Sequence, residues 1–229
     1  MRVKWITSLE VVLINGTVFR TKGSNRTRKD TTGFATLRLF LGSEGTLGII
    51  TQLTICLAPV LPLKVALTSF PKVSQAVSTV TSILSSGTTP TSLELLDGTS
   101  IKGLNLANLL PEKLVEEPTV LMRFSGMTQE VNEVALRRVA EIVRVDGGRE
   151  LTVAKDEKEN EELWKARKSQ YWSQQLLIGE SCRVLITDVC VPISRLADFV
   201  ASSEQHVQES GLIAPIVAHI GDGKAKQDH

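Results

Sequence analysis

The feature that most constrains this chain is a run of three glycines within seven residues, Gly42-Ser43-Glu44-Gly45-Thr46-Leu47-Gly48. Glycine lacks a Cβ, so such a turn can adopt positive φ and lets a ligand lie against its backbone amides. The β-branched stretch that follows, Leu47 to Ile55, is typical of a buried strand. Two interpretations stay open: a cofactor resting on bare backbone, or a plain turn between strands. The loop is neither a P-loop, since no Gly-Lys-Ser/Thr closes it, nor a Rossmann fingerprint, since no G-x-G-x-x-G opens a helix.

The composition is that of a globular protein. The chain has 229 residues, of which 42% are hydrophobic and 22% charged, and its formal net charge is +1. This length fits one large domain or two small ones. The near-neutral charge gives no overall attraction to nucleic acid or to an anionic membrane. The most apolar stretch, Leu47 to Leu63, is interrupted by Gln52, Pro59 and Pro62, so we expect no transmembrane segment.

The cysteines indicate the redox environment. Cys56, Cys182 and Cys190 lie in largely apolar surroundings and at no metal-binding spacing. We therefore expect buried thiols rather than disulfides, and a reducing compartment rather than secretion.

The local patterns change character at Pro59 to Pro62. Before this point, Asn15-Gly16 between two β-rich runs predicts a hairpin, and the whole region is rich in strands and turns. The two prolines predict a domain boundary, with a first domain at residues 1–59 and a second at residues 60–229.

In the second domain, strand and helix patterns alternate. Strands are expected at residues 63–70, 92–96, 119–125, 150–154, 184–191 and 212–218, and helices at residues 71–86, 128–146, 156–176 and 194–210. In the helix at 128–146, the apolar residues that lie toward one side are Val131, Val134, Ala135, Val139, Ile142 and Val143. This order predicts an antiparallel sheet with helices on one face, which is an α+β fold.

One candidate for chemistry is Arg167, three residues after Trp164 and therefore on the same helix face. An Arg held beside a Trp can present its planar fork to a carboxylate. The alternative is an ordinary surface Arg paired with a neighbouring Glu.

A second candidate is His219, which follows a strand pattern and precedes the turn Ile220-Gly221-Asp222-Gly223. A His in this place can be a metal ligand, a proton shuttle or a structural residue. No second His or Cys stands at a useful metal-binding spacing, since His206 is on the preceding helix and His229 is the last residue.

Several of these segments resemble the FAD-linked oxidases. The hairpin region Ser8–Val18 is similar to the closing strands of the FAD-binding domain in flavoproteins of the vanillyl-alcohol-oxidase type, and Leu39–Thr51 looks like the FAD-contacting segment of that family. Four further segments are similar to the FAD-linked oxidase C-terminal domain: Leu93–Asp97, Leu163–Arg167, Thr187–Ser194 and His219–Gly223. Their order and spacing resemble the cytochrome-linked D-lactate dehydrogenases.

The resemblance implies a fold and an activity. The fold is the C-terminal half of a FAD-binding α+β domain followed by a ferredoxin-like cap domain with an antiparallel sheet. The activity is oxidation of a D-2-hydroxy acid such as D-lactate to the 2-oxo acid by FAD, with cytochrome c as the electron acceptor and the mitochondrion as the location. The expected roles are contact with FAD for Gly42, Ser43, Glu44, Gly45, Thr46, Gly48 and Ile49, carboxylate binding for Arg167, and ligation of a divalent metal such as Zn or Mn for His219.

The sequence also departs from the family pattern His-x-Gly-Asp-Gly-Asn-x-His. Lys224 replaces the Asn, and Lys226 stands where the second His belongs, so a cation would oppose the metal ion. The pattern begins near Thr7 and fails after Gly223, which suggests a chain truncated at both ends. The alternative function is therefore a catalytically inactive fragment that serves as a fold or as a binding module.

Overall fold

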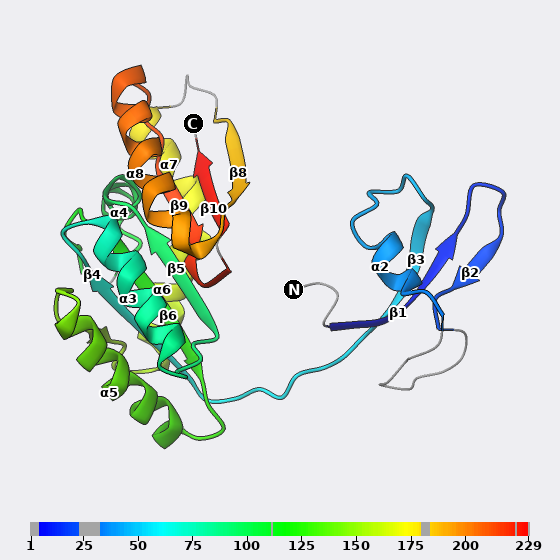
Figure 1. Cartoon of the computed structure of the whole chain (residues 1–229), viewed down its shortest axis with the longest axis horizontal. Helices are drawn as coiled ribbons and strands as arrows, with labels where there is room; N and C mark the ends of the chain where they lie inside the picture. The colour runs from blue at the N-terminus through cyan, green and yellow to red at the C-terminus, as the bar shows by residue number, and fades with distance from the viewer. Residues whose placement is uncertain (1–4, 23–32, 111, 180–183, 223, 229) are drawn as a thin grey trace. The chain divides into compact units, whose positions relative to one another are not determined.

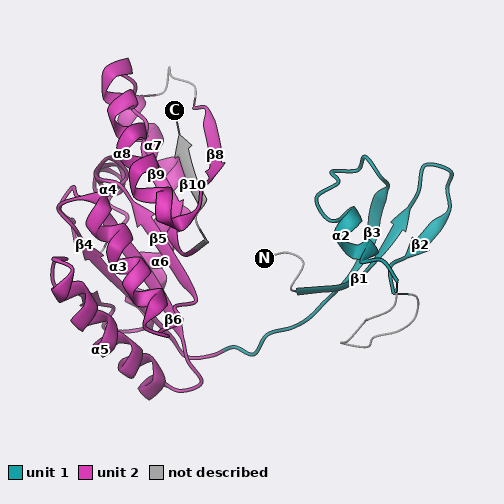
Figure 2. Cartoon of the chain, in the orientation of Figure 1, with its two compact units in different colours: residues 1–60 teal, residues 61–229 magenta. Residues whose placement is uncertain are grey.

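The computed structural model describes residues 5–22, 33–110, 112–179, 184–222 and 224–228. The chain divides into two compact units, Met1–Val60 and Leu61–His229. Figure 1 labels the helices and strands of both units, and Figure 2 colours each unit differently.

Unit 1 is a small antiparallel sheet with one short helix. Its strands β1 (Ile6–Val12), β2 (Val18–Arg20) and β3 (Ile49–Ile55) are arranged in the order β2-β1-β3, and helix α2 covers Thr36–Phe40. The predicted hairpin is confirmed: β1 and β2 pair antiparallel, and the turn places Gly16 at φ +79°. The core of the unit consists of Leu9 and Val11 from β1 and Phe40 from α2.

Two expectations about unit 1 are wrong. Helix α2 forms in a region that the sequence predicts to be strands and turns. Strand β3 is found where a strand is expected, but every residue of it is exposed rather than buried, with Ile49 at 67% and Ile55 at 54% of full exposure. In the described part of this unit, α2 alone covers the sheet, and it packs on Leu9 and Val11, so no second layer lies over β3. An apolar run predicts that a strand is suited to burial. It does not show whether another element of the fold covers that strand.

Unit 2 is built on a seven-stranded sheet in the order β7-β4-β6-β5-β9-β10-β8, in which every recorded pair is antiparallel. The strands are β4 (Leu63–Ser69), β5 (Ser92–Leu96), β6 (Thr119–Ser125), β7 (Thr152–Val153), β8 (Ile186–Cys190), β9 (Ile216–His219) and β10 (Lys224–Asp228). The helices are α3 (Val73–Ser85), α4 (Gly98–Leu106), α5 (Gln129–Val145), α6 (Glu157–Lys168), α7 (Gln170–Ile178) and α8 (Ile193–Ser210), and a short 3-10 turn, η1, covers Ile220–Asp222.

Helices cover both faces of this sheet, which corrects the expectation of one covered face. Helices α3, α5 and α8 pack on one face, where Leu93 and Leu95 of β5 join the largest apolar cluster. Helices α4 and α6 pack on the other, where Leu96 of β5 and Leu121 of β6 contact two smaller clusters. Because alternate residues of a strand point to opposite faces, β5 contributes to both layers. The α+β class with an antiparallel sheet is confirmed.

The predicted helices differ from the observed ones in three places. Helix α4 was not expected, and its N-cap is Asp97, whose side chain accepts a hydrogen bond from the Ser100 amide. The helix predicted at 156–176 is two helices that meet at Ser169. In α5, Val139 and Val143 are buried and Ala135 and Ile142 pack against the core, as expected. Val131 and Val134 are instead exposed at 53% and 58%, and Asn132 and Leu136 are buried in their place.

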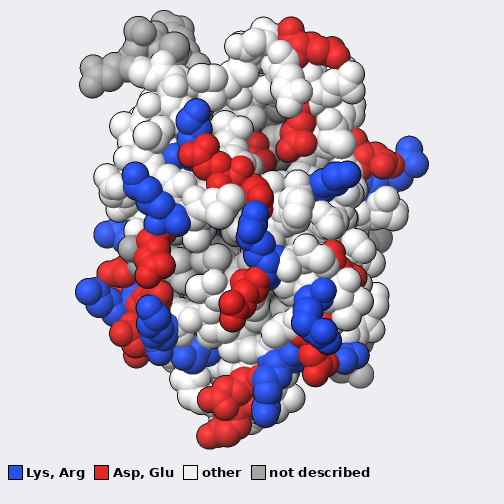
Figure 3. Space-filling model, turned by 90° about the vertical axis from the view of Figure 1, so that its left-hand side faces the viewer, with Lys and Arg blue, Asp and Glu red and all other residues white. Residues whose placement is uncertain are grey.

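The surface agrees with the near-neutral charge. Acidic and basic side chains are interspersed over the face in Figure 3, without a broad patch of one sign. Cys56 and Cys190 are free thiols but are exposed, which contradicts the expectation of burial, and Cys182 lies outside the described residues. Among the described helices, none combines the length and apolar character needed to cross a bilayer.

The Asp97 carboxyl is almost fully buried, and burial raises its pKa from 3.8 to about 6 against the opposing effect of the Ser100 hydrogen bonds. Between these two values the folded state keeps a proton that the unfolded state has lost, so the stability of unit 2 falls as the pH rises through this window. Above pH 6 the free energy of unfolding is lower by about 3 kcal/mol than below pH 3.8 because of this one group.

We predict that Asp97→Asn, which keeps an acceptor for the Ser100 amide without a charge, removes this pH dependence. In urea unfolding, the variant should gain about 3 kcal/mol relative to the parent between pH 4 and pH 7. Parallel stability curves for parent and variant across this range would contradict the assignment.

Candidate functional site

The centre of the candidate site is Glu94, a carboxylate in the middle of β5 that is only 3% exposed. Its neighbours Leu93 and Leu95 point into the largest apolar cluster, so the alternation of the strand directs Glu94 to the opposite face, toward α6. An ionised carboxylate at this depth is costly unless donors surround it.

Four donor contacts surround the Glu94 carboxylate. Ser92 Oγ donates to Oε1 at 3.0 Å, and His219 Nδ1 lies 2.9 Å from the same oxygen. Arg167 donates to Oε2 from both Nε and Nη2, at 3.1 and 2.9 Å. One carboxylate thus joins side chains from β5, α6 and β9, and its acceptor capacity is filled.

Arg167 is held by one edge of its guanidinium. The Nε–Nη2 edge faces Glu94, and the side chain is only 16% exposed, so Arg167 is not the ordinary surface Arg of the alternative interpretation. The Nη1–Nη2 edge carries N–H groups that Glu94 does not use, and this edge can also bind a carboxylate with two parallel hydrogen bonds. Glu94 therefore fixes the direction in which Arg167 presents its second edge.

His219 is the last residue of β9 and directly follows the register pair Leu95 and Ala218, which brings it beside Glu94. An ionised carboxylate only accepts hydrogen bonds, so the contact assigns the proton to Nδ1. In the neutral ring, Nε2 then carries the lone pair. The side chain is 39% exposed, so it is not enclosed by the core.

The glycine loop is in unit 1, between α2 and β3. Gly42 and Gly45 have φ of +86° and +82°, and a Cβ added to either would meet no atom within 4 Å. Gly48 differs, because a Cβ there would lie 2.7 Å from Val11 Cγ1, so packing against β1 already accounts for this glycine. The backbone at Gly42 and Gly45 is thus open. Two apolar residues that follow it, Leu47 and Ile49, are 45% and 67% exposed.

Comparison with known families decides the ancestry of the chain. Residues 62–226, well over half of the sequence, match the family described as FAD linked oxidases, C-terminal domain. The chain belongs to the FAD-linked oxidase family. The resemblance drawn from the sequence motifs is confirmed, and the name of the family implies FAD as its cofactor.

The relatives of this chain include proteins named as D-lactate dehydrogenases and as glycolate oxidase subunits. The chain is 37% identical to a probable mitochondrial D-lactate dehydrogenase of Danio rerio over 95% of this chain and 44% of the relative. It is 36% identical to the mitochondrial D-lactate dehydrogenase [cytochrome] of Arabidopsis thaliana over 95% of this chain and 38% of the relative. A glycolate oxidase subunit of Escherichia coli is 31% identical over 85% of this chain and 38% of the relative. The chain thus spans less than half the length of these relatives.

Solved structures agree on the fold. An alkyldihydroxyacetonephosphate synthase matches 99% of this chain and 46% of its own, with a TM-score of 0.70 at 18% identity. A 4-ethylphenol oxidase from Gulosibacter chungangensis matches 99% of this chain and 51% of its own, with a TM-score of 0.73 at 14% identity. At these identities the likeness extends to the fold alone.

The metal expected from the family motif is not supported by the described residues. Within them, no group of three or more His, Cys, Asp or Glu side chains could hold a metal ion. His219 directs Nδ1 to Glu94, and in the sheet register Lys224 is the β10 residue opposite it. The donor set around His219 in the described residues therefore does not fit a metal ion.

Sequence reasoning identified Arg167 and His219 but gave no role to Glu94 or Ser92. The available signal was a single charged residue, Glu94, between the leucines of the strand Ser92–Leu96. A charged side chain at a buried strand position is rare unless it is paired, which marks such a residue for inspection.

We predict strong coupling between Glu94 and Arg167. Removing either partner alone leaves a buried charge uncompensated, so Glu94→Ala and Arg167→Ala should each cost about 3–5 kcal/mol. The double variant should cost less than the sum by about 1–3 kcal/mol. The measurement is urea unfolding in a Trp5→Phe background, in which the remaining Trp fluorescence reports on unit 2. It gives the free energy of unfolding of the parent, of each single variant and of the double variant.

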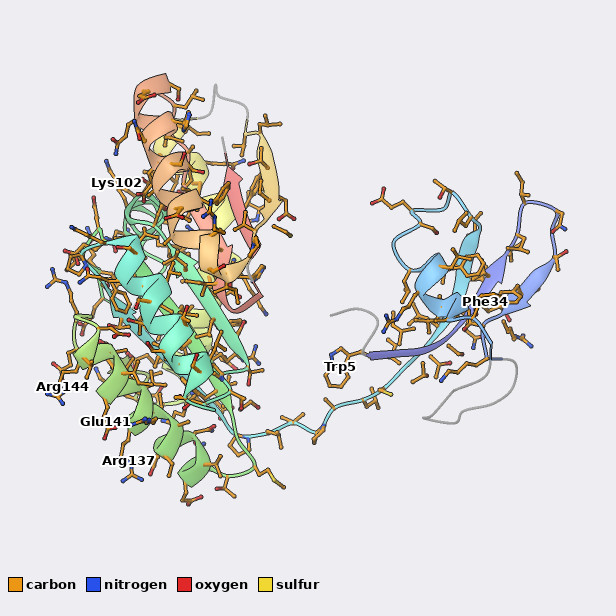
Figure 4. All side chains as sticks on the ribbon, in the orientation of Figure 1. Trp5, Phe34, Lys102, Arg137, Glu141 and Arg144 are labelled. Atoms are coloured by element: carbon orange, nitrogen blue, oxygen red, sulfur yellow. The ribbon has the colours of Figure 1, made fainter. Side chains whose placement is uncertain are left out.

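The exposed pair of Arg138 and Glu141 on α5, 58% and 64% exposed, is the matched control. Glu141, labelled on the outer side of α5 in Figure 4, should change stability by less than about 0.5 kcal/mol when replaced by Ala. Additive effects of the two buried substitutions would contradict the description of the site.

Proposed function

We propose that this chain is part of a FAD-dependent dehydrogenase that oxidises D-lactate or a related D-2-hydroxy acid to the 2-oxo acid. The family match and the names of the relatives support this class of reaction. The relatives also support cytochrome c as the electron acceptor and the mitochondrion as the location, since one is named for cytochrome and two are named as mitochondrial.

The observation that carries the proposal is the convergence of Arg167 and His219 on Glu94. These side chains come from α6, β9 and β5, and they meet on one face of the sheet at hydrogen-bond distance. A cation with a free edge next to an imidazole with a free nitrogen is the pair of groups that a 2-hydroxycarboxylate requires.

In the proposed reaction, the Nη1–Nη2 edge of Arg167 binds the substrate carboxylate and orients the adjacent carbon. His219 Nε2 accepts the proton of the 2-hydroxyl group as the carbonyl bond forms. Glu94 compensates the positive charge that His219 gains, and it keeps Nδ1 protonated throughout. FAD, when bound, supplies the acceptor for the hydride that leaves the same carbon.

The loop of unit 1 fits a role in holding FAD. We propose that Gly42, Ser43, Glu44, Gly45, Thr46, Gly48 and Ile49 contact the cofactor, within a partial FAD-binding domain at residues 1–59 that precedes a substrate domain at residues 60–229. The support is the open backbone at Gly42 and Gly45 beside exposed apolar side chains, a combination suited to a flat and partly apolar ring.

This role can be tested at Gly45. Gly45→Ala should weaken FAD binding at least about tenfold, because the added methyl group occupies the space over the backbone. Gly16→Ala is the matched control, since Gly16 also has a positive φ, +79°, and open space around its Cβ position, so the backbone strain is alike. Flavin fluorescence titration measures both, and equal affinities in the two variants would contradict the proposed contact.

The reaction can be tested at His219. In the FAD-loaded chain, His219→Gln should lower kcat/KM for D-lactate by about 10²–10⁴-fold, as expected for loss of a general base. His206→Gln is the control, because His206 lies exposed on α8 with its Nδ1 beside the Ser202 carbonyl of its own helix. Full activity in His219→Gln would contradict the assigned role. No flavin binding and no D-lactate oxidation by the parent would favour the inactive-fragment alternative.

A further inference from the structure

Arg123 of β6 lies next to the site but takes no part in the Glu94 contacts. In the sheet register it is the partner of Ser92, the residue whose hydroxyl donates to Glu94. Cross-strand partners share a face, so Arg123 and Glu94 lie on the same side of the sheet. This is the side that α6 covers.

The guanidinium of Arg123 is packed but not paired. Its Cζ atom lies 5.0 Å from the ring centroid of Trp164, which is a cation–π contact. Its Nε is buried, and no acceptor among the described residues receives a hydrogen bond from it. No ion pair joins Arg123 to any carboxylate in the described parts of the chain. A buried charged donor without a hydrogen-bond acceptor is destabilising, so binding of an anion to it is favourable.

The charges of Glu94, Arg167, His219 and Arg123 add up to an excess of positive charge. Glu94 neutralises Arg167, and with His219 neutral the positive charge of Arg123 remains uncompensated. Trp164 and Arg167 are three residues apart on α6, which is a rise of about 4.5 Å along the helix. Arg123, stacked on Trp164, therefore lies against α6 about one helical turn before Arg167.

We propose that Arg123 is an anion-binding residue that determines specificity, and that it binds a second anionic group at the far end of the substrate. The substrate class is then a 2-hydroxy acid with a further carboxylate, held by Arg167 at one end and by Arg123 at the other. The choice of substrate rests on the proposed function. The binding of a dianion does not, because it requires neither FAD nor turnover.

The test is a fluorescence titration of the full chain in a Trp5→Phe, Trp172→Phe background, so that Trp164, which contacts Arg123, is the reporter. The probes are succinate, acetate and inorganic phosphate. Succinate should bind at least about tenfold more tightly than acetate, and Arg123→Gln should weaken succinate binding by about tenfold to a hundredfold with little effect on acetate. Arg123→Lys should recover part of the loss, since it keeps the charge but not the fork.

Arg137→Gln is the matched control, since Arg137 points outward from α5 in Figure 4 and is exposed. It should leave the affinity for all three probes unchanged. Because the buried Nε of Arg123 donates to no acceptor among the described residues, Arg123→Gln breaks no hydrogen bond of this atom and should fold, and thermal unfolding checks this.

Three results would overturn the proposal. These are equal affinities for succinate and acetate, unchanged succinate binding in Arg123→Gln, and phosphate binding as tight as that of succinate, which would indicate a general anion contact. If succinate binds through Arg123 but the FAD-loaded chain oxidises no 2-hydroxy acid, the inference stands and the proposed function fails.

Discussion

The candidate site depends on the burial of one carboxylate. Glu94 is 3% exposed and receives donors from Ser92, Arg167 and His219, so its charge is compensated inside the sheet layer. Because all its acceptor positions are used, Glu94 determines which edge of Arg167 and which nitrogen of His219 remain free. The same contacts join β5, β9 and α6. The Glu94 carboxylate therefore both orients the groups of the candidate site and stabilises the packing of unit 2.

The two units contribute differently to the proposed function. Unit 2 supplies charged groups that are fixed by hydrogen bonds on a sheet covered on both faces. Unit 1 supplies bare backbone at Gly42 and Gly45 and the exposed strand β3. Apolar strand residues that stay exposed are typical of surfaces that contact another molecule or layer. This arrangement agrees with a chain that spans less than half the length of its D-lactate dehydrogenase relatives.

Much of the fold could be predicted, because its signals are local. Strands β5 and β6 were predicted to the residue, since each is a short, mainly apolar run bounded by polar or turn residues. Helix α4 was missed because Gly98, Gly103 and Asn105 lower its helix propensity, while the Asp97 cap and tertiary contacts stabilise it. The exposure of β3 and the second helix layer of unit 2 depend on which elements meet in space, which a periodic pattern does not record.

The site was predicted only in part, for the same reason. Arg167 and His219 could be found because they belong to recognisable motifs, but the carboxylate that joins them is 73 residues from one and 125 from the other. Arg123 gave no signal, since its lack of a partner is a property of the folded chain. Pairing of distant charges inside a sheet requires the strand register, which the sequence pattern leaves open.

The most direct measurement of the central claim is the tautomer of His219, read from the ring ¹⁵N shifts of the labelled chain and assigned by comparison with His219→Gln. If Glu94 organises the site, the proton lies on Nδ1 in the parent chain, and Glu94→Gln shifts the population toward Nε2–H. A parent chain with the proton on Nε2, or an unchanged tautomer in Glu94→Gln, would contradict the account.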